Sequence, residues 1–246
     1  MAGDDDERWS SIRAELFGDA AILEDDWVEL EVPDRAEHAA IVPVSIRTRP
    51  PGKDARSVRA VWLVVDENPS PVVGKVSFAP LASPTSLSTR IRVNQYSQVR
   101  AIAQLDDQSL HMDAHFVKAS GGCSAPSSTS DAVAEKRRGK MKLRQRIEDG
   151  RAHLQLLISH PNHSGLQINQ VNRQWIPPDY VNDIVVRVGD QPVFSFSGGI
   201  SMSENPSMSF ELREKVEPAQ LSAEVGDSEG RRFSETWPWA SKSKPE

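Results

Sequence analysis

The sequence contains very little cysteine and no long hydrophobic run. Cys123 is the only cysteine among 246 residues, so neither an intramolecular disulfide nor a zinc site built from several thiolates can form. The longest run of strongly apolar residues, 61–65, is far shorter than the roughly 20 residues of a membrane-spanning helix. These shortages exclude a disulfide-rich scaffold and a helical membrane span.

The sequence also lacks an excess of basic residues and the common catalytic motifs. Its 29 Lys and Arg against 35 Asp and Glu give a net charge of −6, which argues against nucleic acid as the main ligand. No nucleophilic serine motif, phosphate-binding glycine loop or dinucleotide-binding motif is present, so a conventional enzyme has little support. With 38% hydrophobic residues the chain can still form a substantial core.

One helix is predicted, at the N-terminus, from Asp6 as N-cap to Gly18. Its apolar residues recur at helical spacing: Trp9, Ile12, Leu16 and Phe17. The rest of the chain is a series of short β-branched segments bounded by Pro, Gly, Asn or Asp, with no helical pattern between them. This pattern predicts an all-β fold of two antiparallel β-sandwiches after a short N-terminal helix.

The predicted strands are 27–32, 39–49, 58–66, 72–79, 89–105 with a break near 94–97, 111–119, 140–146, 152–159, 184–188, 193–197, 207–213 and 220–225. Residues 189–191 and 227–230 are predicted hairpin turns. Residues 120–139 are rich in Ser, Gly and charge, which is typical of a linker. We therefore predict a helix and lead-in over 1–24, a first sandwich over 25–126, a linker over 127–139 and a second sandwich over 140–240.

The single thiol is the first candidate functional group. Cys123 follows Gly121 and Gly122 and precedes a serine-rich stretch, a composition typical of an exposed loop. A thiol on such a flexible tether suits transfer between proteins better than catalysis in a fixed site. The alternative interpretation is an ordinary loop with an incidental cysteine.

A second candidate is a weak metal site on one predicted strand. His111, Asp113 and His115 alternate, so their side chains project from one face and could bind a divalent metal. A polar alternating face is also what any half-solvated strand shows, and we favour that reading. The segment from His160 to His163 is interpreted as a structural turn that closes a strand.

Several motifs together resemble a known family. Residues 29–126 resemble SoxY, the sulfur-carrying subunit of bacterial sulfur oxidation, and residues 140–239 resemble its partner SoxZ. The SoxY-like pieces are Glu31-Val-Pro-Asp-Arg-Ala-Glu-His-Ala-Ala-Ile-Val-Pro-Val44, Asp66-Glu-Asn-Pro-Ser-Pro71, Ser88-Thr-Arg-Ile-Arg-Val93 and Gly121-Gly-Cys123. The SoxZ-like pieces are Leu157-Ile-Ser-His-Pro-Asn-His-Ser-Gly-Leu-Gln167, Ile176-Pro-Pro178, Ser203-Glu-Asn-Pro206 and Asp227-Ser-Glu-Gly230.

The resemblance implies a fused SoxYZ-like carrier, of a type associated with quinoprotein dehydrogenases. Both halves would be immunoglobulin-like sandwiches that pair with each other. Cys123 would hold a sulfur compound covalently, with Gly121 and Gly122 as the hinge of the arm, while separate enzymes process the cargo. Such carriers are not themselves enzymes and have no metal or organic cofactor.

The resemblance also implies a periplasmic location. The acidic start of the chain does not look like a secretory signal, so we expect that a signal peptide has been removed; a cytoplasmic location is less favoured. The family's arm ends the carrier chain as Gly-Gly-Cys-Gly-Gly, whereas here Ser124-Ala-Pro126 follows and the chain continues. The alternative function is a docking or accessory module for a periplasmic quinoprotein dehydrogenase, with Cys123 incidental.

Overall fold

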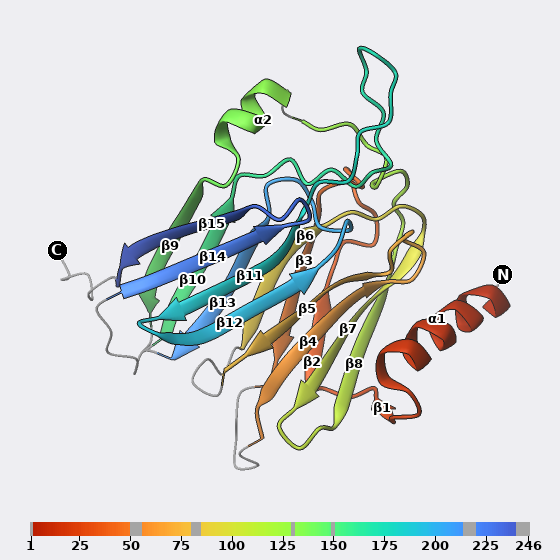
Figure 1. Ribbon diagram of the computed structural model, residues 1–246. Coiled ribbons are helices and arrows are strands. Elements are labelled where there is room, and N and C mark those ends of the chain that lie inside the picture. The colour runs from red at the N-terminus through yellow and green to blue at the C-terminus, as the bar shows by residue number, and fades with distance from the viewer. Residues whose placement is uncertain are drawn as a thin grey trace.

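A computed structural model describes residues 2–49, 56–79, 85–128, 131–148, 151–213 and 220–239. It confirms the predicted all-β fold with a short N-terminal helix (Figure 1). Within these ranges, two helices, α1 (Ala2–Phe17) and α2 (Asp131–Arg137), accompany fifteen strands. The strands are β1 (Ile22–Leu23), β2 (Val28–Glu31), β3 (Val42–Thr48), β4 (Val58–Val65), β5 (Val72–Phe78), β6 (Ser86–Ile91), β7 (Ser97–Leu105), β8 (Leu110–Val117), β9 (Met141–Glu148), β10 (Arg151–Ile158), β11 (Val181–Val188), β12 (Gln191–Gly198), β13 (Ser207–Arg213), β14 (Gln220–Asp227) and β15 (Arg232–Pro238).

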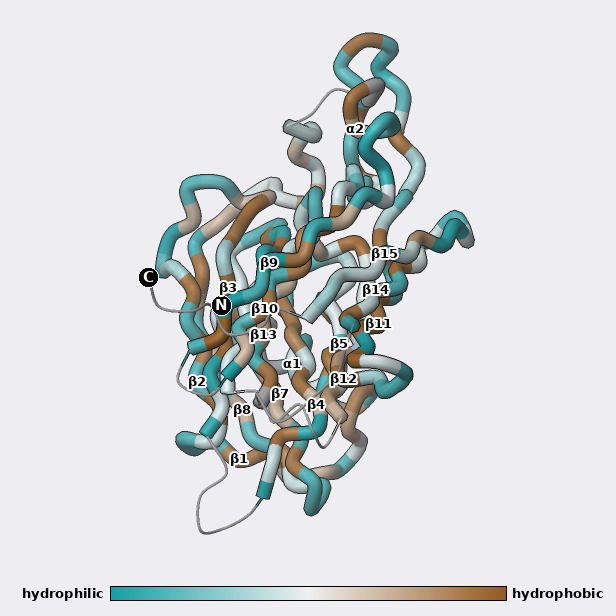
Figure 2. Tube along the Cα trace, turned by 90° about the vertical axis from the view of Figure 1, so that its left-hand side faces the viewer, coloured by the Kyte–Doolittle hydropathy of each residue, from teal (hydrophilic) through white to brown (hydrophobic). Residues whose placement is uncertain are grey.

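The strands form two sheets that face each other across one hydrophobic core. The larger sheet has the order β1-β8-β7-β4-β5-β12-β11-β14-β15, and the smaller has the order β2-β3-β6-β13-β10-β9. Buried and exposed side chains alternate along strands such as β3 and β10, and Figure 2 shows this alternation of hydrophobic and hydrophilic residues along the tube. In the described part of the chain, no helix is both long and apolar enough to span a membrane.

The two sandwiches share their sheets, which the sequence analysis did not anticipate. β5 of the first half pairs with β12 of the second, and β6 pairs with β13, so both sheets run through the boundary between the halves. Pairing these edges removes unsatisfied backbone groups from both sandwiches. Aromatic rings pack where the two halves join. The ring of Phe194 stacks on Phe210 with centroids 4.4 Å apart, and it packs edge to face with Phe78 at a centroid distance of 5.9 Å.

The predicted N-terminal helix is confirmed as α1, although it begins at Ala2 rather than at Asp6. It ends before Gly18, whose φ of 59° places it in the left-handed region that favours glycine. Its apolar side packs on the outer face of the larger sheet, where Phe17 contacts Trp62 edge-on at 5.1 Å. This contact gives the larger sheet a second, smaller hydrophobic cluster outside the main core.

Two other elements differ from the sequence prediction. The predicted linker contains the short helix α2, and the two-residue strand β1 lies where no strand was predicted. β15 pairs with β14, as the predicted hairpin turn at 227–230 and the strand terminus expected at Trp237-Pro-Trp239 imply. The predicted strand 89–105 is broken as expected, into β6 and β7, and both predicted hairpin turns join paired strands.

We predict that the two sandwiches unfold as one cooperative unit, because one core cluster runs through both. Phe194→Ala removes a buried ring at the junction and should lower the free energy of unfolding by about 3–5 kcal/mol. Phe116→Ala, at a ring that is 41% exposed, should cost less than about 1 kcal/mol. Urea denaturation followed by fluorescence and circular dichroism checks both values. Two separate transitions would contradict the shared core.

Candidate functional site

Cys123 is buried, so the predicted exposure of its thiol is wrong. Its side chain is 0% exposed although its neighbour Ser124 is exposed. The reason is tertiary: residues 121–128, which we call the cysteine loop, fold back between the two halves of the molecule. Contacts from both halves hold the loop there.

The first half holds the glycines of the cysteine loop. Gly121 has a φ of 77° and donates its N–H to the carbonyl of Asn94 at 2.8 Å, and Gly122 donates to the carbonyl of Val93 at 3.0 Å. A Cβ on Gly122 would lie only 2.1 Å from the carbonyl oxygen of Ala39. Only glycine therefore allows the backbone to approach this closely.

The second half holds the residues that follow the glycines. The Ser164 hydroxyl donates to the carbonyl of Cys123, and Nε2 of Gln167 donates to the carbonyl of Ala125 at 2.8 Å. The backbone N–H of Ser128 donates to the carboxylate of Glu204 at 2.9 Å. The cysteine loop is thus fixed at both of its ends and by both halves of the chain.

A buried arginine lies beside the thiol. The guanidinium of Arg92, which is 1% exposed, donates to the backbone carbonyls of Met202 at 3.2 Å, Gly122 at 3.0 Å and Asn162 at 3.1 Å. No ion pair to Arg92 occurs among the described residues, so carbonyl groups alone compensate its charge at contact distance. Burial lowers the pKa of Arg92, and Cys123 and Glu204 act in the opposite direction.

Asn68 positions the strand end that carries Arg92. Its Nδ2 donates to the carbonyl of Arg92 at 2.7 Å and to the hydroxyl of Ser201 at 3.0 Å. Its Oδ1 accepts the N–H of Asn94 at 2.8 Å. This fully buried amide therefore ties the first half of the chain to the second at the point where the cysteine loop docks.

Burial controls the chemistry of the thiol. It raises the pKa of Cys123 to about 11, and the positive charge of Arg92 opposes this only in part. The thiol is therefore protonated at neutral pH, and a protonated thiol is a poor nucleophile. The docked loop keeps the sulfur unreactive, so any chemistry at Cys123 requires that the loop leave its site.

The weak metal candidate formed by His111, Asp113 and His115 does not bring its side chains together. Nδ1 of His111 lies 2.9 Å from Asp25, and its Nε2 lies 2.9 Å from the Ser109 hydroxyl, so protein groups engage both ring nitrogens. Asp113 accepts the N–H of Leu30 and lies 3.5 Å from His115. The three side chains do not converge as a ligand set.

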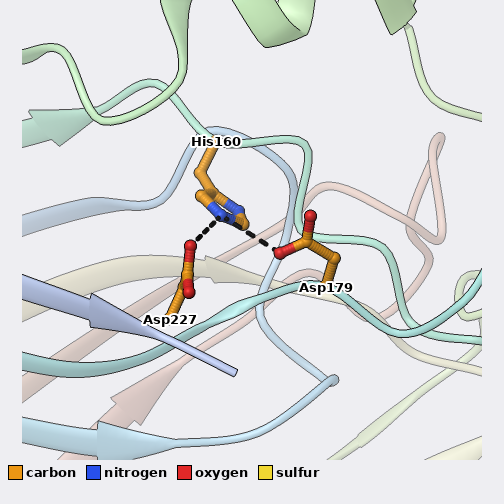
Figure 3. A group of neighbouring side chains, drawn as sticks. All are labelled: His160, Asp179 and Asp227. Atoms are coloured by element: carbon orange, nitrogen blue, oxygen red, sulfur yellow. Dashed lines mark ion pairs between the residues drawn. The ribbon is translucent and has the colours of Figure 1, made fainter. Parts of the chain in front are cut away.

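Among the described residues, one other set brings a histidine and two carboxylates together: His160, Asp179 and Asp227 (Figure 3). Nε2 of His160 lies 3.4 Å from Asp227 and 3.6 Å from Asp179. His160 and Asp227 are buried.

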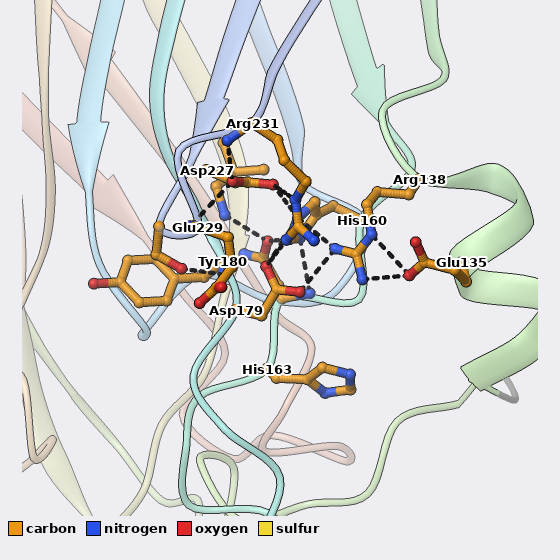
Figure 4. Close-up of polar contacts among 12 residues, drawn as sticks. Glu135, Arg138, His160, His163, Asp179, Tyr180, Asp227, Glu229 and Arg231 are labelled. Carbon is orange, nitrogen blue, oxygen red and sulfur yellow. Dashed lines mark hydrogen bonds and ion pairs between the residues drawn. The ribbon is translucent and has the colours of Figure 1, made fainter.

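Two arginines already neutralise these carboxylates (Figure 4). Arg138 lies 2.9 Å from Asp179, and Arg231 contacts both Asp179 and Asp227. Burial lowers the pKa of His160, so its ring is neutral at pH 7. The cluster is best explained as an ion-pair network that ties α2 to the second half, which agrees with the structural role predicted for the turn at His160.

The contacts around the cysteine loop come from residues that the sequence analysis did not single out. They are Asn68, Arg92, Ser164, Gln167 and Glu204. Each of them lies within a sequence piece that carries the family resemblance. The sequence therefore contained these residues as motif positions, but it did not show that they surround Cys123. The structure brings these pieces together at one end of the two-sheet sandwich.

Fold and site together define a two-sandwich protein that encloses one thiol where its halves meet. The sequence matches the family of the sulfur oxidation protein SoxY over residues 13–123 and that of the sulphur oxidation protein SoxZ over residues 141–238. The chain therefore joins a SoxY domain and a SoxZ domain of the sulfur-oxidation proteins in one polypeptide. No curated protein matches the chain.

Solved structures show weaker likeness. The sulfur carrier protein SoxY from Chlorobium limicola f thiosulfatophilum is 24% identical over 47% of this chain and 94% of that chain, with a TM-score of 0.40. A superoxide reductase (neelaredoxin) from Ignicoccus hospitalis is 18% identical over 37% of this chain and 78% of that chain, with a TM-score of 0.32. Since both TM-scores are below 0.5, the family assignment rests on the sequence matches.

We predict that the reactivity of Cys123 keeps rising to an unusually high pH. With a pKa of about 11 instead of the ordinary 9, the docked thiol has about a hundredfold less thiolate at pH 8. Its alkylation rate with iodoacetamide should rise about tenfold per pH unit up to about pH 11. The urea-unfolded protein is the control and should level off near pH 9. A native profile that also levels off near pH 9 would contradict the raised pKa of the docked thiol.

A methyl group on Gly122 should release the cysteine loop. In Gly122→Ala the new Cβ would overlap the carbonyl of Ala39, so the docked position is closed to it. We expect alkylation of Cys123 at pH 8 to become at least about tenfold faster. Gly199→Ala is the matched control, because its nearest neighbour atom would be the Ser70 hydroxyl at 3.5 Å, an ordinary contact. Unchanged alkylation in Gly122→Ala would show that the docked loop does not protect the thiol.

Proposed function

We propose that the protein carries sulfur compounds covalently on Cys123 and presents them to separate oxidising enzymes in the periplasm. The observation that carries this proposal is the position of Cys123. It is the last residue of the SoxY match, it follows the two glycines of the resembling arm, and it lies where the two domains meet. Gly121 and Gly122 are the hinge in this proposal.

The docked loop supports a carrier with two states. In the docked state the sulfur is enclosed by both domains and held away from solvent. In the released state the same thiol reaches a partner enzyme with its pKa back in the ordinary range. A carrier benefits from this separation, because a sulfur adduct that is exposed between two enzymes would exchange with other thiols.

Arg92 supports an anionic cargo. Its buried guanidinium binds the carbonyl of Gly122 and, within the described ranges, no carboxylate, so an anion attached to Cys123 would find a counter-charge beside it. Oxidised sulfur species such as an S-sulfonate carry a negative charge at neutral pH. Joining thiosulfate to the thiol removes two electrons and one proton, so the loading partner must accept electrons. A quinoprotein dehydrogenase or a sulfur-oxidising enzyme fits this requirement.

The fusion of the two domains in one chain fits the same role. The enclosed site needs groups from both domains, among them Arg92 from the first and Ser164 and Gln167 from the second. A single polypeptide makes this pairing intramolecular and raises the effective concentration of the domains to the order of millimolar or more. The site then no longer depends on assembly of two subunits.

A second candidate function follows from the burial of the thiol. A docking or accessory module for a periplasmic dehydrogenase would need no released thiol, and the protonated, enclosed Cys123 is compatible with a structural role. In that case Cys123→Ala would leave the protein's function in cells intact. Thermal stability alone does not separate the two functions, because removing any buried side chain lowers it.

Intact-protein mass spectrometry on protein from native host cells, before and after a thiol reductant, tests the carrier function. During growth on a reduced sulfur compound we expect a reductant-sensitive, sulfur-containing adduct on the wild-type chain and none on Cys123→Ala. Ser124→Ala, at the exposed neighbour, is the matched control and should carry the adduct. A bare wild-type thiol under these conditions would refute the carrier function and favour the docking module.

A further inference from the structure

A hairpin beside the cysteine loop stands out from the two sheets. Residues 165–178, which we call the 165–178 hairpin, connect β10 to β11 and project from the end of the molecule that holds the cysteine loop (Figure 1). Its backbone is ordered by a bridge between Ile168 and Trp175 and by a bond from the N–H of Asn169 to the carbonyl of Gln174 at 2.9 Å. At the tip, Arg173 has a φ of 60° and the N–H of Val171 donates to Oδ1 of Asn169.

The 165–178 hairpin exposes large apolar side chains among its polar ones. Val171 is 93% exposed, Trp175 66% and Ile168 40%. Figure 2 shows the same hydrophobic colour at the end of the projecting loop. Such exposure is unfavourable in water and is uncommon on a surface that stays solvated.

The hairpin contains few charged residues, as the core of a protein–protein interface does. Arg173 is its only charged residue and it contains no carboxylate, whereas 26% of the whole chain is charged. The central residues of protein–protein interfaces are typically depleted of charged side chains but enriched in Trp and Arg. An isolated positive charge beside two apolar anchors fits a partner surface with an apolar pocket and a carboxylate at its rim.

The base of the hairpin is bonded to the cysteine loop. Ser164 immediately precedes the hairpin and holds the carbonyl of Cys123, and Gln167 inside the hairpin holds that of Ala125. A protein that receives Cys123 must therefore approach this end of the molecule and meet the hairpin. A second exposed pair, Tyr96 and Phe116, packs edge to face, and Tyr96 lies two residues after Asn94, whose carbonyl accepts the N–H of Gly121.

We propose that the 165–178 hairpin is the docking element for the enzyme that loads the thiol. Val171 and Trp175 enter an apolar pocket of that enzyme, and Arg173 pairs with a carboxylate at its rim. Because the base of the hairpin holds the cysteine loop, docking at the tip brings the partner directly to the contacts that must open for release. This inference rests on the carrier function proposed above.

The test compares enzymatic loading in Val171→Asp, Trp175→Ala and Arg173→Glu with the wild type. Each protein is recovered from native host cells grown on thiosulfate, and the fraction of Cys123 that carries a sulfur adduct is measured by intact mass. We expect the loaded fraction to fall about tenfold or more in Val171→Asp and Trp175→Ala. Leu23→Asp is the matched control, because Leu23 is 50% exposed on β1 and lies on the far edge of the larger sheet; it should load normally.

Two further readouts separate docking from folding. The melting temperature and the rate of alkylation of Cys123 by iodoacetamide should match the wild type in the hairpin variants, because neither needs a partner. Wild-type loading in both apolar variants would overturn this inference alone, as would an equal loss in Leu23→Asp. The absence of an adduct on the wild type would overturn the carrier function and this inference with it.

Discussion

The buried guanidinium of Arg92 is the contact on which the arrangement of the site depends. An arginine side chain has only donors and stays charged at neutral pH, so burial requires several acceptors around it. Here the acceptors are carbonyls from three separate segments, at Gly122, Asn162 and Met202. The same side chain therefore holds the cysteine loop, the turn that follows β10 and the segment between β12 and β13 in one place.

The shared sheets make that meeting point rigid. Pairing of β5 with β12 and of β6 with β13 turns two sandwiches into one structure with a continuous core. The ends of β6 and β10 then lie together, and the segments that follow them build the site around Cys123. Residues that are more than 100 positions apart in sequence, such as Asn68 and Ser201, become hydrogen-bond partners. The site thus depends on fusion of the sheets and not on either sandwich alone.

Burial of the thiol protects it in the docked position, and the proposed carrier function adds a released, reactive state. In the docked position the pKa of Cys123 is raised to about 11, and in solvent it would return to about 9. The chain continues beyond Cys123 to α2, so release moves a loop that stays tethered at both ends and not a free chain end. Under the proposed carrier function, a partner enzyme would have to accept a loop of two adjacent chain segments, so docking surfaces close to the loop would be important.

The sequence by itself determined the fold class, the succession of strands along the chain, the N-terminal helix and the family. These follow from local information: alternating hydrophobicity, turn residues and short motifs, each readable within a few residues. It also singled out Cys123 with its two glycines. Only the tertiary structure decided that the thiol is buried, because burial comes from Arg92, Ser164 and Gln167, which are distant in the chain. In the same way, His111 was available as a metal ligand by its spacing alone, until Asp25 and Ser109 were found to engage its ring.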